Sequence, residues 1–147
     1  EIADRDWSSD VCSSDLTTPQ TAAAEVAERT GLIAAQTKQK VVGVIENMSY
    51  MPQPDGSRLE IFGSGGGRTV SDSLTRTLGY DVPLLAQLPL DIRLREGSDG
   101  GVPAAVAEDG RPAADAPAAL ELASVARRLA HRSRGLAGRR LSLKVAT

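Results

Sequence analysis

The sequence has little of what disulfide-bonded, metal-binding and membrane-spanning proteins need. Its 147 residues include one cysteine, one histidine and only 3% aromatic residues. One cysteine cannot form a disulfide within the chain, and a zinc or iron site needs several Cys or His ligands. No apolar run approaches the length of about 18 residues that a membrane helix requires. We therefore expect a protein without a disulfide, an intrachain metal site or a membrane span, with a core of Ala, Val, Leu and Ile.

The charge is nearly balanced. Seventeen Lys and Arg against nineteen Asp and Glu give a net charge of −2 at pH 7. Such a balance does not by itself drive a protein onto nucleic acid or an anionic membrane. The 41% apolar and 24% charged residues are typical of a globular domain, and the length suits one such domain. We expect a soluble, cytoplasmic protein whose partners include no membrane and no specific nucleic acid.

The first sixteen residues differ from the rest of the chain. They contain five acidic residues, one basic residue and the only tryptophan and cysteine, without helical or strand periodicity. The peptide DWSSDVCSSDL, which ends at Leu16, matches a translation of a common DNA sequencing adapter. We therefore predict that residues 1–16 are non-native and have no fold. The remaining 131 residues carry a net charge of +2 and no cysteine.

Predicted helices alternate with short apolar strands in the rest of the chain. We expect helices at 21–39, 68–78 and 117–131, strands at 41–45 and 82–88, and a turn-rich excursion at 51–58. Strands that are apolar on both faces are typical of a parallel sheet covered by helices. The buried stripe of the first helix is predicted to contain Val26, Ala27, Ile33 and Ala34, with Gly31 at a close contact. The pattern predicts an α/β fold with a mostly parallel sheet.

Candidate binding residues follow the predicted strands, because an open parallel sheet binds ligands at the carboxyl ends of its strands. Asn47 follows the first strand, and Pro89 to Asp91 follow the second. The side-chain amide of Asn47 offers both a donor and an acceptor, which suits the edge of a purine base. An asparagine at this position could equally satisfy backbone groups in a turn. Both interpretations remain open from the residues.

Two other features suggest anion or polymer binding only weakly. Gly63 to Gly67 precede a predicted helix, whose first N–H groups attract anions. A Walker A loop ends in Gly-Lys-Ser/Thr, whereas Gly67 is followed by Arg68 and Thr69. A flexible or close-packed glycine loop is therefore the favoured interpretation. The basic tail at 132–147 has no interleaved aromatic residues, so we expect at most non-specific contact with nucleic acid.

The order of several motifs resembles the carboxyl-terminal half of the Mrp/ApbC family, in its actinobacterial type. These motifs are TTPQ (17–20), GVIENMS (43–49), IFGSGGG (61–67), VPLL (82–85) and LPLD (88–91). The family consists of deviant-Walker P-loop ATPases that are related to MinD and ParA and act as iron-sulfur cluster carriers. The resemblance implies a doubly wound, mostly parallel sheet with its amino-terminal half missing from this chain.

The resemblance also implies ligands and partners. ATP with Mg²⁺ would bind at the strand ends of the intact protein, with Asn47 contacting adenine and with Pro89, Leu90 and Asp91 beside the base. Two subunits would form a homodimer over the nucleotides, and iron-sulfur apo-proteins would be targets. Residues 17–131 would be the carboxyl-terminal part of the ATPase domain, followed by the tail at 132–147. Walker A and Walker B would lie upstream of Thr17, so we expect this chain to be inactive by itself.

One departure from the family concerns the cluster. Carriers typically have a Cys-x-x-Cys pair after the ENMS motif, and this sequence has Gln53 and Gly56 at those positions. Neither residue offers a thiolate to iron. The alternatives are a carrier that holds its cluster in another way, and a MinD/ParA-like partition or regulatory ATPase that carries no cluster.

Overall fold

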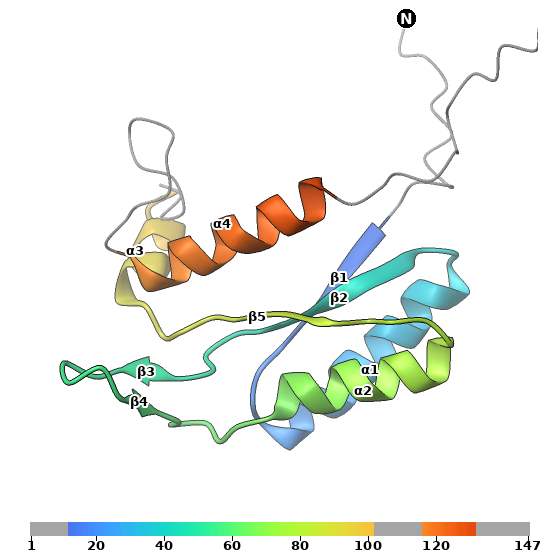
Figure 1. Ribbon diagram of the computed structural model, residues 1–147, viewed down its shortest axis with the longest axis horizontal. Coiled ribbons are helices and arrows are strands. Elements are labelled where there is room, and N and C mark those ends of the chain that lie inside the picture. The colour runs from blue at the N-terminus through green and yellow to red at the C-terminus, as the bar shows by residue number, and fades with distance from the viewer. Residues whose placement is uncertain (1–11, 102–115, 132–147) are drawn as a thin grey trace, which may run out of the picture.

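The fold is built on a three-stranded parallel sheet. A computed structural model describes residues 12–101 and 116–131 (Figure 1). The strands β1 (Cys12–Thr17), β2 (Lys40–Glu46) and β5 (Leu84–Gln87) are hydrogen-bonded in the order β1-β2-β5. This arrangement confirms the predicted parallel sheet. The basic tail at 132–147 lies outside the described residues.

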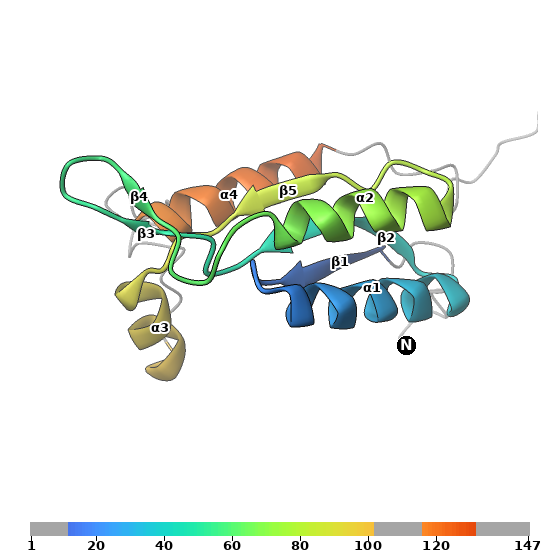
Figure 2. The same cartoon turned by 90° about the horizontal axis from the view of Figure 1, so that it is seen from below.

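Helices cover both faces of the sheet. The helices α1 (Thr21–Gln36) and α2 (Gly66–Leu78) pack on one face, and α4 (Pro117–Ala130) packs on the other (Figures 1 and 2). A hairpin of β3 (Met51–Pro52) and β4 (Arg58–Leu59) extends from the end of the sheet where β2 and β5 finish, with α3 (Ile92–Asp99) nearby. None of the helices in the described ranges is long and apolar enough to cross a membrane.

The core is divided between the two faces of the sheet. On the α1 and α2 side it comprises Ala24, Ala27, Ala34, Val41, Val44, Val70, Leu74 and Val82. On the α4 side a smaller cluster comprises Leu85, Ala86, Leu88 and Val125. The predicted stripe of α1 is half wrong, because Val26 and Ile33 are 62% and 59% exposed. Small residues take their place, and a Cβ on Gly31 would lie 2.7 Å from a Leu74 methyl group, which confirms the predicted close contact.

The prediction that residues 1–16 have no fold is wrong for residues 12–16, which form most of β1. Backbone N–H and C=O groups make the hydrogen bonds of a β-ladder, so a segment can pair even when its side chains do not suit the position. The exposure of two β1 side chains is the reverse of what their polarity favours, since Asp15 is 8% exposed and Leu16 is 61% exposed. Asp15 Oδ2 is buried without a hydrogen-bond partner in the described ranges, and burial raises the pKa of this carboxyl to about 6. The adapter interpretation itself stays a prediction.

Candidate functional site

Backbone hydrogen bonds join the segments that follow the three strands. The Asn47 N–H donates to the Thr17 carbonyl at 2.8 Å, which ties the end of β2 to the end of β1. On the other side the Leu88 N–H donates to the Glu46 carbonyl at 2.7 Å, and the Leu90 N–H donates to the Tyr50 carbonyl at 2.7 Å. Asn47 and the Pro89–Asp91 loop therefore leave the sheet from adjacent strand ends.

The side-chain oxygen of Asn47 makes a hydrogen bond within a local turn. Its Oδ1 accepts a hydrogen bond of 2.9 Å from the Met48 N–H, and Met48 has a left-handed backbone with φ of 54°. This bond confirms the local-turn interpretation for the oxygen. Within the described ranges, Nδ2 of Asn47 makes no hydrogen bond. The half-buried side chain borders a hollow of about 580 Å³ over β1 and α1, so its amide nitrogen remains available to donate.

The loop after β5 combines a buried proline with an incompletely bonded acid. Pro89 is fully buried, and Leu90 and Asp91, which follow it, are half-buried. Asp91 Oδ1 accepts from the Arg93 N–H at 3.0 Å and so caps α3, a helix that the polar sequence did not predict. Asp91 Oδ2 is buried and has no hydrogen-bond partner in the described part of the chain. This oxygen can accept a hydrogen bond from a ligand.

The glycine-rich segment is close-packed where α2 begins, at Gly66 and Gly67. A Cβ on Gly66 would lie 2.5 Å from the Thr18 carbonyl oxygen and 2.6 Å from that of Pro19. The Gly67 N–H donates to Glu46 Oε2 at 2.6 Å. The close-packed interpretation is therefore confirmed at these two glycines. The phosphate-loop interpretation is wrong for Gly67, because a protein carboxylate already takes its N–H.

Glu46 is a residue of this edge that the sequence pattern did not reveal. It is fully buried, and its two carboxylate oxygens accept from the Gly67 N–H and, at 2.8 Å, from Gln87 Nε2. The signal in the sequence is an acid at the end of an apolar strand, directly before Asn47. An acid in that position is almost never buried without partners.

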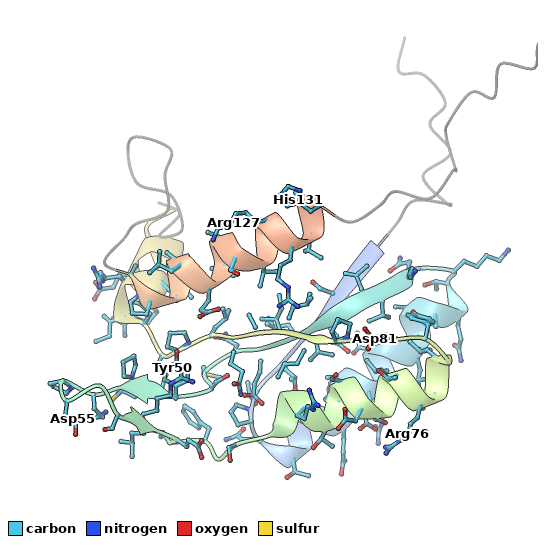
Figure 3. The ribbon with its side chains drawn as sticks, in the orientation of Figure 1. Tyr50, Asp55, Arg76, Asp81, Arg127 and His131 are labelled. Carbon is cyan, nitrogen blue, oxygen red and sulfur yellow. The ribbon has the colours of Figure 1, made fainter. Side chains whose placement is uncertain are left out.

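The hairpin holds turn residues at the two positions where the resemblance implies a cysteine pair. The Gly56 N–H donates to the Gln53 carbonyl at 3.0 Å, and Gly56 has φ of 83°. Asp55, at the tip in Figure 3, accepts from the Ser57 N–H and Oγ, and these two bonds lower the pKa of its carboxyl. Across residues 12–101 and 116–131, no group of three His, Cys, Asp or Glu side chains could hold a metal ion.

Comparison with known proteins places the chain in a family. Residues 15–128 match the family described as ParA, NUBPL iron-transfer P-loop NTPase. The chain belongs to this family. A relative, the iron-sulfur cluster carrier protein of Mycobacterium leprae, is 52% identical over 128 residues, which are 87% of this chain and 32% of the relative. A protein of the same name from Synechocystis is 41% identical over 107 residues, which are 71% of this chain and 29% of that protein.

These matches confirm the resemblance to Mrp/ApbC-type proteins, and the chain spans about a third of the length of such relatives. Solved structures agree on the fold of this ParA-family chain. MinD of Pyrococcus horikoshii, complexed with Mg-ADP, has a TM-score of 0.55 at 20% identity, covering 88% of this chain and 44% of that one. MinD of Aquifex aeolicus has a TM-score of 0.53 at 17% identity, covering 84% and 45%. The predicted MinD/ParA-like P-loop NTPase fold is confirmed.

Proposed function

We propose that this chain supplies the base-binding edge of an ATPase that acts in iron-sulfur cluster assembly or transfer. One observation carries the proposal: an uncommitted amide donor on Asn47 and an unpartnered acceptor on Asp91 lie on adjacent strand ends in the described part of the chain. Adenine presents ring nitrogens that accept and an exocyclic amine that donates. Asn47 Nδ2 would donate to a ring nitrogen, and Asp91 Oδ2 would accept from the amine. Leu90 would form the apolar side of the base site, with the buried Pro89 supporting it from behind.

The phosphates and Mg²⁺ need other residues. The sequence contains no Gly-Lys-Ser/Thr, and the N–H of Gly67 is bonded to Glu46. We propose that the complete protein supplies these groups outside the present chain, which spans 32% of its mycobacterial relative. By itself the chain would neither hold the triphosphate nor hydrolyse it. The complete protein would act as a cytoplasmic homodimer that delivers clusters to apo-proteins.

Substitutions at the two proposed base contacts test this function. In the full-length protein, Asn47→Ala and Asp91→Asn are each expected to weaken ATP binding about tenfold, because each removes one hydrogen bond to the base. Asp91→Asn can keep the oxygen that caps α3 while replacing the unpartnered acceptor with a donor. Isothermal titration calorimetry measures the dissociation constants, with Glu25→Gln on the exposed face of α1 as the control. Unchanged ATP affinity in both variants would contradict the proposed base site.

The second candidate function is a regulatory or partition ATPase that carries no cluster. The composition of the hairpin favours it, since Gln53 and Gly56 replace the thiolate pair and take part in the turn. A carrier role requires that ligands come from outside this hairpin. The two functions therefore differ in whether the complete protein binds a cluster at all.

Anaerobic reconstitution with iron and sulfide separates the two functions. If the full-length protein is a carrier, we expect wild type and Gln53→Ala to bind equal amounts of iron, since neither has a thiolate in the hairpin. Visible absorbance and iron content are the measurements. Loss of iron in Gln53→Ala alone would refute the expectation that the hairpin provides no ligand. Absence of stoichiometric cluster absorbance in both proteins would favour the regulatory ATPase.

A further inference from the structure

We propose that Glu46 is a positioning residue for the nucleotide base, an inference that rests on the proposed function. Its carboxylate joins the first turn of α2 to the last residue of β5, at the level where both base-contact segments leave the sheet. Glu46 contacts no ligand in this role. It fixes the spacing between Asn47 and the Pro89–Asp91 loop.

Burying the Glu46 carboxylate is costly unless its oxygens are bonded. Glu46 is 0% exposed, and a buried charge is tolerated only with hydrogen bonds or an opposite charge. Both of its oxygens are bonded, to the Gly67 N–H at 2.6 Å and to Gln87 Nε2 at 2.8 Å. The positive end of the α2 dipole lies at the first of these bonds. Glu46 is therefore held in one orientation from two sides.

Helix α2 depends on Glu46 for its N-terminal cap. The residue before the helix is Gly65, which has no side chain to accept from the first turn. Glu46 accepts from the second residue of the helix, as a Ser or Asp at the cap position would. A Cβ on Gly67 would lie 2.7 Å from the Glu46 Cβ, so the absence of a side chain at Gly67 allows the contact. The bond thus fixes α2 against the end of β2.

Glu46 is adjacent in the chain to one proposed base contact and bonded to the segment that carries the other. The residue after it is Asn47, whose N–H is bonded to β1, and the Glu46 carbonyl accepts from the Leu88 N–H and from Ser49 Oγ. Its side-chain partner Gln87 directly precedes the segment from Leu88 to Asp91. One residue therefore bonds, through backbone and side chain, to both sides of the proposed base site. A shift of Glu46 would move the two contacts relative to each other.

The test compares ATP with inorganic tripolyphosphate, which has the phosphates but no base. In the full-length protein, Glu46→Met is expected to weaken ATP binding about tenfold while tripolyphosphate binding is unchanged. Gln87→Met, at an exposed position, removes only the link to β5 and should act in the same direction without unfolding the protein. Glu46→Gln is the conservative control, because the new side-chain amide can still accept from the Gly67 N–H and can pair with a rotated Gln87 amide.

The outcomes separate positioning from stability. Selective loss of ATP affinity in both methionine variants, with retention in Glu46→Gln, supports the inference. A double variant of Glu46→Met with Asn47→Ala should lose less ATP affinity than the two single variants combined, because both substitutions act on the contact between Asn47 and the base. Equal weakening of ATP and tripolyphosphate, or no weakening, overturns the inference. A wild-type protein that binds tripolyphosphate as tightly as ATP would instead overturn the proposed function.

Discussion

Replacing Asp15 with valine is expected to raise the free energy of unfolding by about 2 kcal/mol. The carboxyl is buried beside α1, its Oδ2 has no hydrogen-bond partner among the described residues, and a Cβ on Gly31 would lie 3.4 Å from that oxygen. Valine suits a buried strand and removes the unsatisfied group. Urea unfolding followed by circular dichroism measures the change. Ser14→Val, on the exposed side of the same strand, is the control and should change the free energy by less than about 0.5 kcal/mol.

The effect of Asp15 should depend on pH with a defined sign. Burial raises the pKa of this acid from 3.8 to about 6, so the folded protein binds a proton more tightly than the unfolded chain. The penalty is absent below the unfolded pKa and grows as pH rises towards the folded pKa of about 6. The stability difference between Asp15→Val and wild type should therefore be largest at pH 7 and shrink towards pH 4. A difference that is constant with pH would show that the carboxyl is not the source of the effect.

The substitution Gly66→Ala is expected to lower the free energy of unfolding by about 3 kcal/mol. Its Cβ would lie 2.5 Å and 2.6 Å from two backbone carbonyl oxygens, which cannot move aside as a flexible side chain can. The first turn of α2 would have to shift away from the end of β1. Thermal or urea unfolding of the variant provides the measurement.

Gly63, in the loop that precedes α2, distinguishes the effect of crowding from that of backbone strain. Gly63 has φ of 83° and nothing within 4 Å of the place where a Cβ would lie. Gly63→Ala should therefore cost only the backbone strain, about 1 kcal/mol. Similar losses for the two variants would contradict the role of close packing at Gly66.

The sheet and the candidate base site could be predicted because their determinants are local in the sequence. Apolar runs mark β2 and β5, and an open parallel sheet binds ligands at the carboxyl ends of its strands, where Asn47 and Asp91 follow. The stripe of α1 was partly mispredicted because hydrophobicity favours Val26 and Ile33, whereas close packing on Leu74 selects Ala and Gly. Strand β1 was missed because backbone groups make its pairing, and because Asp15 is buried while Leu16 is exposed.

Glu46 shows why the remainder of the site needs the structure. Its partners lie 21 and 41 residues further along the chain, so no local pattern joins them. An acid before Asn47 looks like a solvated strand end until the approach of α2 and Gln87 is known. The glycine loop was ambiguous for the same reason, since only the fold shows which acceptor its N–H groups meet.

The two clusters of the core differ in size, so the two faces of the sheet should differ in the free energy of local unfolding. The cluster on the α4 face comprises four buried residues, and Arg128 Nη1 donates a hydrogen bond of 2.6 Å to the Leu85 carbonyl. The cluster on the face with α1 and α2 comprises eight. Regions with fewer buried apolar contacts open at lower free energy than the global transition. Of the three helices that cover the sheet, α4 is therefore expected to exchange its amides with solvent first, and the β2 amides are expected to exchange later.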